Sequence, residues 1–418
     1  MDSPAYDAIV IGGGPGGSTA ATFLARARRR VLVLEKDRHP RFHIGESLLP
    51  YNRSIFQELG VLPKLEAAGF IHKHGAQFHL GNGAKSVQFV FREGKLTRQR
   101  EAIQVERAKF DHLLLQHAQA SGAEVREGRT VARFTSEHGG ISVEARSDSG
   151  EAQTFRGAFL IDASGRGNVT GNQEGLRVIH PRLKKLAVFG HFSGVKLSPG
   201  ERGGDTVIVR LANKWFWLIP LEADKVSVGC VMDKDEFAQS RAPTDKLFWR
   251  IVQNSPPMRE RMEHARLVND IQTTTDFSYY NKRFVGDRLL RVGDAAGFMD
   301  PIFSAGVYLA MYSAKLAAEA VETSLQRGDD GARRFRRYEK QVRRAMEVYF
   351  HMVHHFYTTP FMEIFLEPRP KWNLPAAVNA VLAGETKGGW SFWWRLQVFF
   401  WIVRVQRFWA LVPRISFD

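Results

Sequence analysis

The chain has 418 residues, of which 44% are hydrophobic, so it is long enough for two or three domains with a sizeable buried core. Its one cysteine, Cys230, excludes an intrachain disulfide, and without a zinc-type cluster of cysteines and histidines we expect no metal and a cytoplasmic location. The net charge of +15 favours an acidic partner, but it is spread along the chain without a nucleic-acid motif, so we expect no nucleic acid.

The N-terminal segment YDAIVIGGGPGGSTAATFLARARRRVLVLEKD predicts a strand, a glycine-rich turn, a helix and a second strand. Its turn fits GxGxxG. Gly12 would form the tight turn, Gly14 would let the backbone approach a pyrophosphate, and Gly17 would let the helix pack on the strand. The second strand ends at Glu35, which would bind the ribose hydroxyls of an adenine dinucleotide. The spacing therefore predicts a βαβ dinucleotide site.

Two later segments, FLIDASGRGN and RLLRVGDAAGFMDP, each read as a strand that runs into a turn. With HIGESLLP and QVERAKFDHLLLQHA, they resemble the later fingerprints of a two-domain flavoprotein fold. Hydroxybenzoate-type monooxygenases, geranylgeranyl reductases and flavin-dependent halogenases share that fold. The resemblance covers roughly residues 5–360 and implies that the dinucleotide is FAD.

The same resemblance implies which residues contact FAD. The aspartate matching Asp294 lies beside the pyrophosphate and ribityl chain, Arg107 matches an arginine near the flavin, and Val131 matches an adenine contact. No second GxGxxG is present, so the flavin would be reduced by a separate flavin reductase or by a transiently bound nicotinamide. The expected cofactor-binding residues are Gly12, Gly14, Gly17, Glu35, Lys36, Arg41, Ser47, Arg107, Val131, Asp162, Asp294 and Gly306.

Alternating stretches between the cofactor segments, such as DTVIVRLANKWFWLIPLEADKVSVGCVM, predict a mostly antiparallel sheet. Within it, KWFWLIP places Trp215 and Trp217 two residues apart, on one face of a strand. Core packing would explain such a pair. However, the stretch also resembles the WxWxIP signature of flavin-dependent halogenases. That resemblance implies an indole wall between flavin and substrate, which suppresses direct hydroxylation.

Two further stretches resemble the same family. GFIHKHGAQFHLG puts Lys73 where phenol and carrier-protein halogenases have their catalytic lysine, although most lysines simply lie at the surface. FMDPIFSAGVYLA puts Ser304 beside the flavin ring and implies a halide site on the amides of Ala305 and Gly306, with a flavin-packing turn as the alternative. The resemblance implies that hypohalous acid, made at the flavin from reduced FAD, oxygen and chloride or bromide, is delivered through Lys73. The expected catalytic residues are Lys73, Trp215, Trp217 and Ser304.

The expected substrate is an electron-rich aromatic small molecule, a phenol or pyrrole, or another activated carbon, of the kind used in secondary-metabolite biosynthesis. Phe303 stands where tryptophan halogenases have a glutamate, so free tryptophan is not expected. The substrate would be free or tethered to an acyl or peptidyl carrier protein, whose acidic surface suits this basic chain. Two alternatives stay open: a geranylgeranyl-reductase-like FAD oxidoreductase with a lipidic substrate, and a non-catalytic flavin-binding or carrier-docking partner.

The C-terminal stretch GGWSFWWRLQVFFWIVRVQRFWALVPRISFD combines five tryptophans with arginines, among them Arg395, Arg404 and Arg407. The arginines make it a poor transmembrane helix. Three interpretations stay open: a lid over a substrate tunnel, a dimer surface, and a helix lying in a membrane interface. The third would give peripheral contact with the inner face of a membrane through residues 388–412.

These segments together predict an α/β fold in which a Rossmann-like FAD-binding domain is interleaved with an antiparallel-sheet substrate domain and followed by a helical C-terminal region. The predicted ranges are 1–70, 101–170 and 284–330 for the FAD-binding domain, 71–100 and 171–283 for the sheet, and 331–418 for the helical region.

Overall fold

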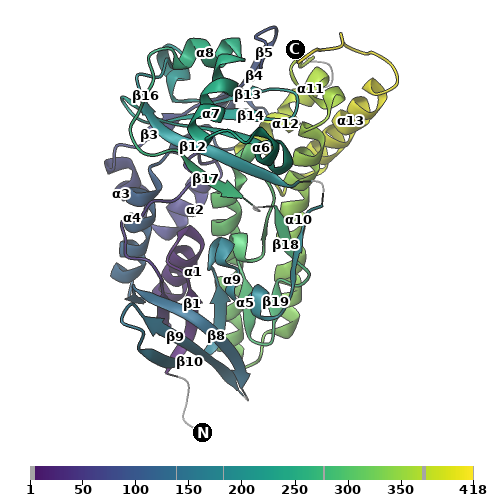
Figure 1. The fold of residues 1–418 in the computed structure, drawn as a ribbon. Coiled ribbons are helices and arrows are strands. Elements are labelled where there is room, and N and C mark those ends of the chain that lie inside the picture. Colours follow the sequence, from purple (N-terminus) through teal and green to yellow (C-terminus); the bar gives the residue numbers. More distant parts are fainter. Residues whose placement is uncertain (1–4, 138, 182, 276–277, 370–372, 418) are drawn as a thin grey trace.

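The first of two large sheets grows from the N-terminal βαβ unit. In the computed structural model, which describes residues 5–137, 139–181, 183–275, 278–369 and 373–417, this sheet occupies the lower half of the molecule (Figure 1). Its strands follow the order β19-β20-β10-β1-β2-β7, parallel from β20 to β7, and a β8–β9 hairpin is added to β10. The strands are β1 (Tyr6–Ile11), β2 (Val31–Leu34), β7 (Glu124–Arg126), β8 (Arg129–Glu137), β9 (Gly140–Ser147), β10 (Ala152–Asp162), β19 (Val285–Gly286) and β20 (Leu289–Arg291).

Both faces of this sheet are covered, which explains the continuous apolar runs of its central strands. On one face, α1 packs against the alanine-rich α9 and against α4, while the β8–β9 hairpin covers the other face. The helices of this part are α1 (Pro15–Arg26), α2 (Asn52–Leu59), α3 (Leu62–Ala67), α4 (Arg107–Ala120), α5 (Val169–Gln173) and α9 (Ala305–Arg327).

The second sheet lies above the first and has the order β16-β12-β15-β14-β13-β4-β5, with β17 also paired to β12. All of its pairings are antiparallel except that of β13 with β4. Its strands are β4 (Gly75–Leu80), β5 (Ser86–Val90), β12 (Lys185–Ser193), β13 (Thr206–Arg210), β14 (Trp215–Glu222), β15 (Lys225–Asp233), β16 (Arg266–Leu267) and β17 (Gln272–Thr275).

Alternation along β14 divides the second sheet between two cores. Phe216 and Leu218 pack toward α6 (Lys234–Ser240), α7 (Thr244–Gln253) and α8 (Pro256–Met262), whereas Trp215 and Trp217 face the core shared with α9 and the C-terminal helices. The strand period of two thus aims both indoles toward the region between the sheets. Two small sheets complete the fold: β3 (Ile71–Lys73) pairs with β6 (Ala102–Gln104), and β18 (Tyr279–Asn281) pairs with both β11 (Arg177–Ile179) and β21 (Gly297–Phe298).

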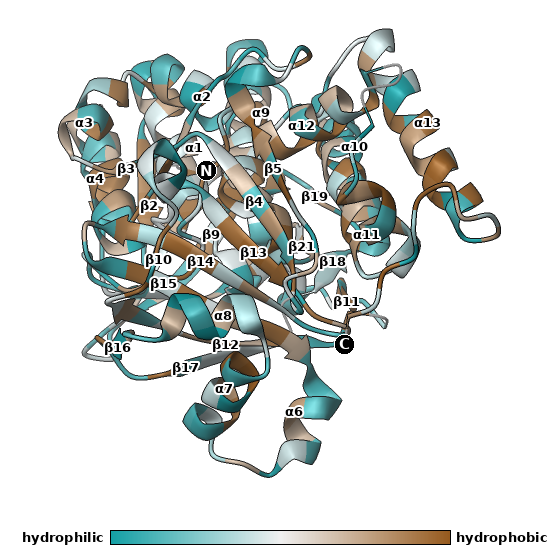
Figure 2. Ribbon diagram, turned by 90° about the horizontal axis from the view of Figure 1, so that it is seen from above, coloured by the Kyte–Doolittle hydropathy of each residue, from teal (hydrophilic) through white to brown (hydrophobic). Residues whose placement is uncertain are grey.

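The C-terminal region is helical. Its long first helix, α10, packs on α9 and contributes to the cores of both halves. Seen from above, α10 to α13 stand together at one side of the second sheet (Figure 2). The predicted fold class is confirmed, while the exact domain limits stay a prediction. These helices are α10 (Ala332–Phe356), α11 (Thr359–Phe365), α12 (Leu374–Ala383) and α13 (Trp390–Gln406).

Candidate functional site

A cavity of about 360 Å³ lies between the two sheets. Its lower wall comes from the turns at the carboxyl ends of β1, β2, β10 and β20, where parallel α/β sheets bind their ligands. Its upper wall comes from β13 and β14 of the second sheet. One continuous space therefore joins the predicted dinucleotide site to the indole pair.

Two glycines of the turn after β1, Gly12 and Gly17, have no room for a side chain. Gly12 adopts a φ of 98°, and a Cβ there would lie 2.5 Å from the carbonyl oxygen of Ala163. A Cβ on Gly17 would lie 1.8 Å from the carbonyl oxygen of Gly12, so this residue packs helix against turn and does not line the cavity. Gly14 lines the cavity at the N-terminus of α1, which favours an anion.

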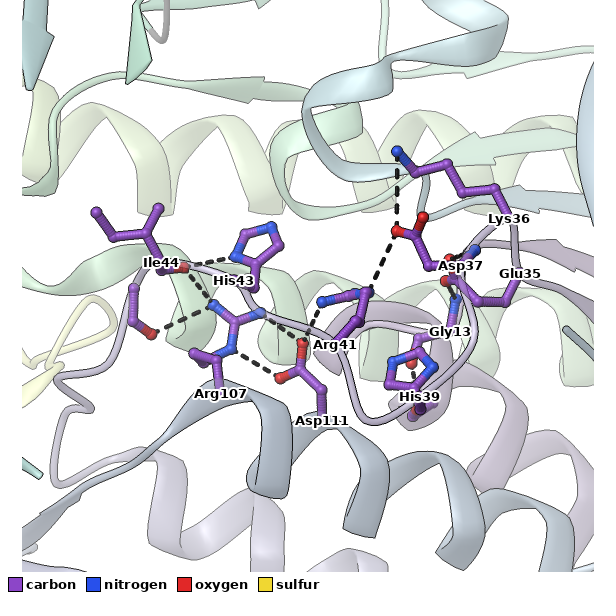
Figure 3. Close-up of polar contacts among 12 residues, drawn as sticks. Gly13, Glu35, Lys36, Asp37, His39, Arg41, His43, Ile44, Arg107 and Asp111 are labelled. Atoms are coloured by element: carbon purple, nitrogen blue, oxygen red, sulfur yellow. Dashed lines mark hydrogen bonds and ion pairs between the residues drawn. The ribbon is translucent and has the colours of Figure 1, made fainter. Parts of the chain in front are cut away.

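Glu35 directly follows β2 at the edge of the cavity. Its carboxylate accepts hydrogen bonds from the backbone amide of Gly13 at 2.5 Å and from that of Asp37 at 2.8 Å. The two bonds fix the carboxylate where the turn of β1 meets the end of β2 (Figure 3). Lys36 and Val131 line the same cavity.

A network of ion pairs holds the segment 41–47 along the cavity (Figure 3). Arg107 donates to both carboxylate oxygens of Asp111, at 2.7 and 2.9 Å, and to the carbonyl oxygen of Ile44 at 2.7 Å. Arg41 donates to the same Asp111 carboxylate at 3.2 Å. Burial alone would raise the pKa of Asp111, but the Arg107 guanidinium lowers it below its ordinary value. Asp111 is therefore a charged anchor for two arginines.

The donors around the cavity fit FAD. Arg41, Arg129 and Arg166 line the cavity. Arg129 and Arg166 each have one buried guanidinium nitrogen without a hydrogen-bond partner, and the buried Arg41 Nε lies 3.5 Å from Asp37 Oδ2 as an ion pair. Buried cationic donors are costly unless an acceptor satisfies them, and a pyrophosphate supplies such oxygens. Asp294 also lines the cavity, and burial raises its pKa to about 6. These groups would hold the phosphates and ribityl chain, with the adenosine near Glu35.

Asp162 lies behind the cavity wall. It is fully buried, and its carboxylate accepts hydrogen bonds from the backbone amides of Ser164 and Thr170, both at 2.9 Å. The carboxylate thus shapes the turn after β10 and does not face the cavity.

The indole pair forms one wall of the cavity. The rings of Trp215 and Trp217 lie 5.9 Å apart between centroids, and both side chains are buried. The Trp217 indole N–H donates to Ser227 Oγ at 3.1 Å, and its ring lies over Gly229, where a Cβ would approach to 2.2 Å. The Trp215 indole N–H donates to Tyr357 Oη at 2.9 Å. Both rings are therefore held by a hydrogen bond at the indole nitrogen.

Lys73 does not line the cavity but is hydrogen-bonded to Ser47, which does. Its side chain is buried at 2% exposure, and Nζ donates to Ser47 Oγ at 2.8 Å and to the carbonyl oxygen of Leu48 at 3.1 Å. Ser47 lines the cavity and also bonds to Thr206 Oγ1 at 2.8 Å. Burial lowers the pKa of Lys73 to about 7, partly offset by the negative charge of Asp205. A neutral amine uses two hydrogens for these two acceptors and keeps a lone pair.

The turn before α9 brings its backbone amides toward the cavity. Ser304 has a left-handed backbone with a φ of 55°, a strained conformation for a residue other than glycine. Ala305 and Gly306 begin the helix, and no side chain caps its first amides. Ser304 and Gly306 line the large cavity, whereas Ala305 lines a neighbouring space of about 20 Å³ that Gly306 and Asp300 share. A space of that volume can hold one water molecule or one ion of similar size.

Tyr357, which the sequence did not single out, links the indole wall to this turn. Its hydroxyl accepts from the Trp215 indole and donates to Asp300 Oδ2 at 2.8 Å. The other Asp300 oxygen accepts from the amide of Ile302 at 3.0 Å. Burial raises the pKa of Asp300 to about 6, partly offset by the Tyr357 hydroxyl. We infer that Tyr357 is a positioning residue for wall and turn together.

The structure brings together most of the predicted site residues. The cavity lining does not include Gly17, Lys73, Asp162 and Ala305. Arg129 and Thr206 were missed because no motif marks their strands, and Arg166 was missed although it lies within the quoted segment FLIDASGRGN. The predicted residues in the lining are Gly12, Gly14, Glu35, Lys36, Arg41, Ser47, Arg107, Val131, Trp215, Trp217, Asp294, Ser304 and Gly306.

Comparison with known proteins identifies the family. Residues 5–350 match the FAD binding domain. The chain is 29% identical to a 1H-pyrrole-2-carbonyl-(peptidyl-carrier protein) chlorinase of Pseudomonas fluorescens. The match covers 93% of this chain and 91% of the relative. It is 33% identical to the corresponding brominase of Pseudoalteromonas luteoviolacea, covering 85% and 86%.

Two further similarities agree with these. A tryptophan 2-halogenase of Chondromyces crocatus is 35% identical over 75% of this chain, which spans 60% of that enzyme. Among solved structures, the myxobacterial chondrochloren halogenase is 34% identical with a TM-score of 0.78, covering 83% of this chain and 81% of the other. All four similar proteins carry a halogenating activity in their names.

The charge of Lys73 predicts a pH-dependent stability. Unfolding returns its pKa from about 7 to the ordinary 10.5, so between these values the unfolded chain binds more protons and the free energy of unfolding rises with pH. Between pH 7 and 10, the free energy of unfolding of the wild type should rise by about 3 kcal/mol more than that of Lys73→Met. Denaturant unfolding of both proteins across this range measures the difference. A difference that does not change with pH would contradict the lowered pKa.

Tyr357→Phe should loosen the wall and the turn together. The variant leaves the Trp215 indole N–H and the Asp300 carboxylate without their partner, at a cost of about 1–3 kcal/mol in the free energy of unfolding. Because Asp300 also holds the amide of Ile302, the apparent KM for halide should rise about threefold or more. Tyr338→Phe is the matched control, since its buried hydroxyl donates to the carbonyl oxygen of Arg291 and it lines neither space. Equal halide KM values in both variants would reduce Tyr357 to a packing role.

Proposed function

The chain belongs to the flavin-dependent halogenases, and we propose that it halogenates an electron-rich aromatic substrate by way of Lys73. It is an FAD-dependent enzyme that uses a halide. Membership of this family favours halogenation over the geranylgeranyl-reductase-like alternative. When bound and reduced by a flavin reductase, FAD supplies the capacity to convert oxygen and halide into hypohalous acid. The rest of the proposal concerns what this chain's own residues do.

The halide would be held at the start of α9. The first amides of a helix carry partial positive charge and lack carbonyl partners, so Ala305 and Gly306 offer N–H donors to an anion. The neighbouring space of about 20 Å³ is also lined by Asp294 and Asp300, whose pKa values lie near 6 because both are buried. These carboxyl groups oppose an anion there once they ionise. Halide affinity should therefore weaken as the pH rises above about 6.

Lys73 would transfer the halogen as a neutral amine. Its nitrogen attacks the halogen of hypohalous acid, so that an N–halogen bond forms while the O–halogen bond breaks and water is released with the amine proton. The electron-rich carbon then takes the halogen from nitrogen and loses its ring proton, and the amine regains one. Ser47, which contacts both Nζ and the cavity, is the point where hypohalous acid would meet the amine.

The substrate would be a phenol or pyrrole, and presentation on a carrier protein is the form that we favour. Two relatives are named for carrier-bound pyrrole, and the net charge of +15 suits an acidic carrier. Phe303 is buried and packs on Phe356, so the turn before Ser304 supplies no carboxylate to assist proton loss. An activated ring needs less help from a base. Free tryptophan, the substrate of a further relative by its name, is the comparison substrate.

The observation that carries this proposal is the buried Lys73 amine joined to the cavity through Ser47. Lys73→Met should lower the rate of product halogenation about 100-fold or more, while hypohalous acid, measured with a small diketone trap, still forms. Lys196→Met, at an exposed ion pair with Glu260, is the control. Mass spectrometry of pyrrole and phenol substrates, free and carrier-bound, with added flavin reductase measures the products.

The pH profile of the same reaction tests which form of Lys73 acts. With a pKa near 7, the neutral amine predominates above that value, so the rate should rise with pH through about 7 and then level off. A rate that falls over this interval would show that the protonated amine is the active form and acts as a hydrogen-bond donor. Wild-type rates in Lys73→Met would exclude either role.

The indole wall should keep the substrate away from the oxidant at the flavin. Replacing both Trp215 and Trp217 by phenylalanine opens the wall, and hydroxylated substrate plus hydrogen peroxide should rise about threefold or more relative to halogenated product. Gly229→Ala disturbs the wall independently, because its Cβ would displace the Trp217 ring. Trp249→Phe, on α7 at the opposite face of the sheet, is the control. Unchanged product ratios in both wall variants would count against the barrier.

A further inference from the structure

Helix α13 and the loop after it leave several large apolar side chains in water. We call these residues the aromatic ridge: Trp390, Trp401, Phe408, Trp409 and Leu411, whose side chains are 81%, 62%, 71%, 71% and 42% exposed. Both views place α13 and this loop at the outer edge of the molecule (Figure 1, Figure 2). Large apolar side chains exposed together in one short segment indicate an interaction site.

Helix α13 carries large apolar side chains on both of its sides, and the exposed Gln397 and Arg404 share the outward side. Trp390 and Trp401 are eleven residues apart, three turns of helix, and so share the outward side. The inward side is filled by Phe392, Leu396 and Phe399, which are buried in the core with α11 and α12. An ordinary surface helix would be polar on its outward side. The outward rings therefore indicate an apolar neighbour outside the protein.

The loop that carries the rest of the ridge is fixed at its base by buried polar groups. The Gln406 side chain is fully buried, accepts from the amides of Leu411 and Val412, and donates to Glu363 Oε2 at 2.7 Å. Glu363, itself 1% exposed, also accepts from Arg414 at 3.0 Å. These bonds close the loop at both ends, so Phe408 and Trp409 are held outward rather than free to fold back.

The charge around the ridge has one sign. Residues 388–417 contain Arg395, Arg404, Arg407 and Arg414 and no aspartate or glutamate. Arg395 lies over the Trp394 ring at 4.4 Å, and Arg404 and Arg407 are exposed beside the ridge. Two copies of this surface would bring like charges together, which opposes a symmetric dimer through it. The partner must be both anionic and apolar.

We infer that the aromatic ridge docks the enzyme on the surface of an anionic lipid bilayer. Tryptophan is favoured at the boundary between headgroups and acyl chains, and arginine beside it pairs with anionic headgroups. Within the described ranges no helix has the length and apolarity needed to cross a membrane, so the contact would be one of lying on the surface. This inference concerns the tail alone and does not rest on the proposed role of Lys73.

Vesicle flotation of the FAD-loaded full chain tests the inference. The protein should float with phosphatidylcholine vesicles that contain phosphatidylglycerol, and at least about tenfold less with phosphatidylcholine alone. A variant with Trp390, Trp401, Phe408 and Trp409 changed to serine should lose at least about tenfold of the bound fraction on the anionic vesicles. Because all four side chains point into solvent, the melting temperature and FAD binding should stay close to those of the wild type.

The matched control changes Ile179 and Val268 to serine, two exposed apolar residues outside the ridge, and should float as the wild type does. Arg404→Gln with Arg407→Gln should weaken only the phosphatidylglycerol-dependent part of binding and its sensitivity to salt. Equal flotation by the wild type and the serine variant would overturn the inference. So would a serine variant that keeps vesicle binding but loses binding to an acidic carrier protein, or loses a concentration-dependent dimer.

Discussion

The burial of the Lys73 amine is the constraint on which the site depends. An ammonium group taken out of water loses several kcal/mol of hydration, so the fold shifts the amine toward its neutral form instead of pairing it directly with a carboxylate. Of the two acceptors of Nζ, Ser47 belongs to the segment 41–47 that the Arg107–Asp111 ion pair anchors, and Leu48 directly follows it. The same network therefore positions the segment along the cavity and the Lys73 nitrogen.

A second set of contacts joins parts of the chain that are distant in sequence. Tyr357 at the end of α10 contacts Trp215 on β14 and Asp300 before α9. The wall that would exclude the substrate and the turn that would hold the halide are thus built against one hydroxyl group. Because both contacts are buried, losing that hydroxyl affects both features at once. Exclusion of substrate and retention of halide, if these features have the proposed roles, would be physically linked in this arrangement.

The sequence predicted the parts of the site that local geometry dictates. The glycine turn requires close backbone approach, Glu35 directly follows a strand, and Trp215 and Trp217 share a face because a strand has a period of two. It could not predict that Lys73 lies behind Ser47, that Asp162 faces away from the cavity, or that Tyr357 spans two elements. The placements of Lys73 and Tyr357 depend on packing between segments 26 to 142 residues apart, and that of Asp162 on the path of the turn after its strand; no local pattern records either.

The tail is joined to the site by packing as well as by chain connectivity. Glu363 holds the base of the loop through Arg414. In addition, the ring of Phe417 lies 5.1 Å from the Arg210 guanidinium, which lies 5.4 Å from the ring of Tyr357. Arg210 is itself buried at 1% exposure, so this stack is part of the core behind the indole wall. A surface that binds the aromatic ridge therefore fixes the orientation of the indole wall relative to that surface. For a substrate delivered on a carrier protein, docking would set the direction from which the carrier approaches.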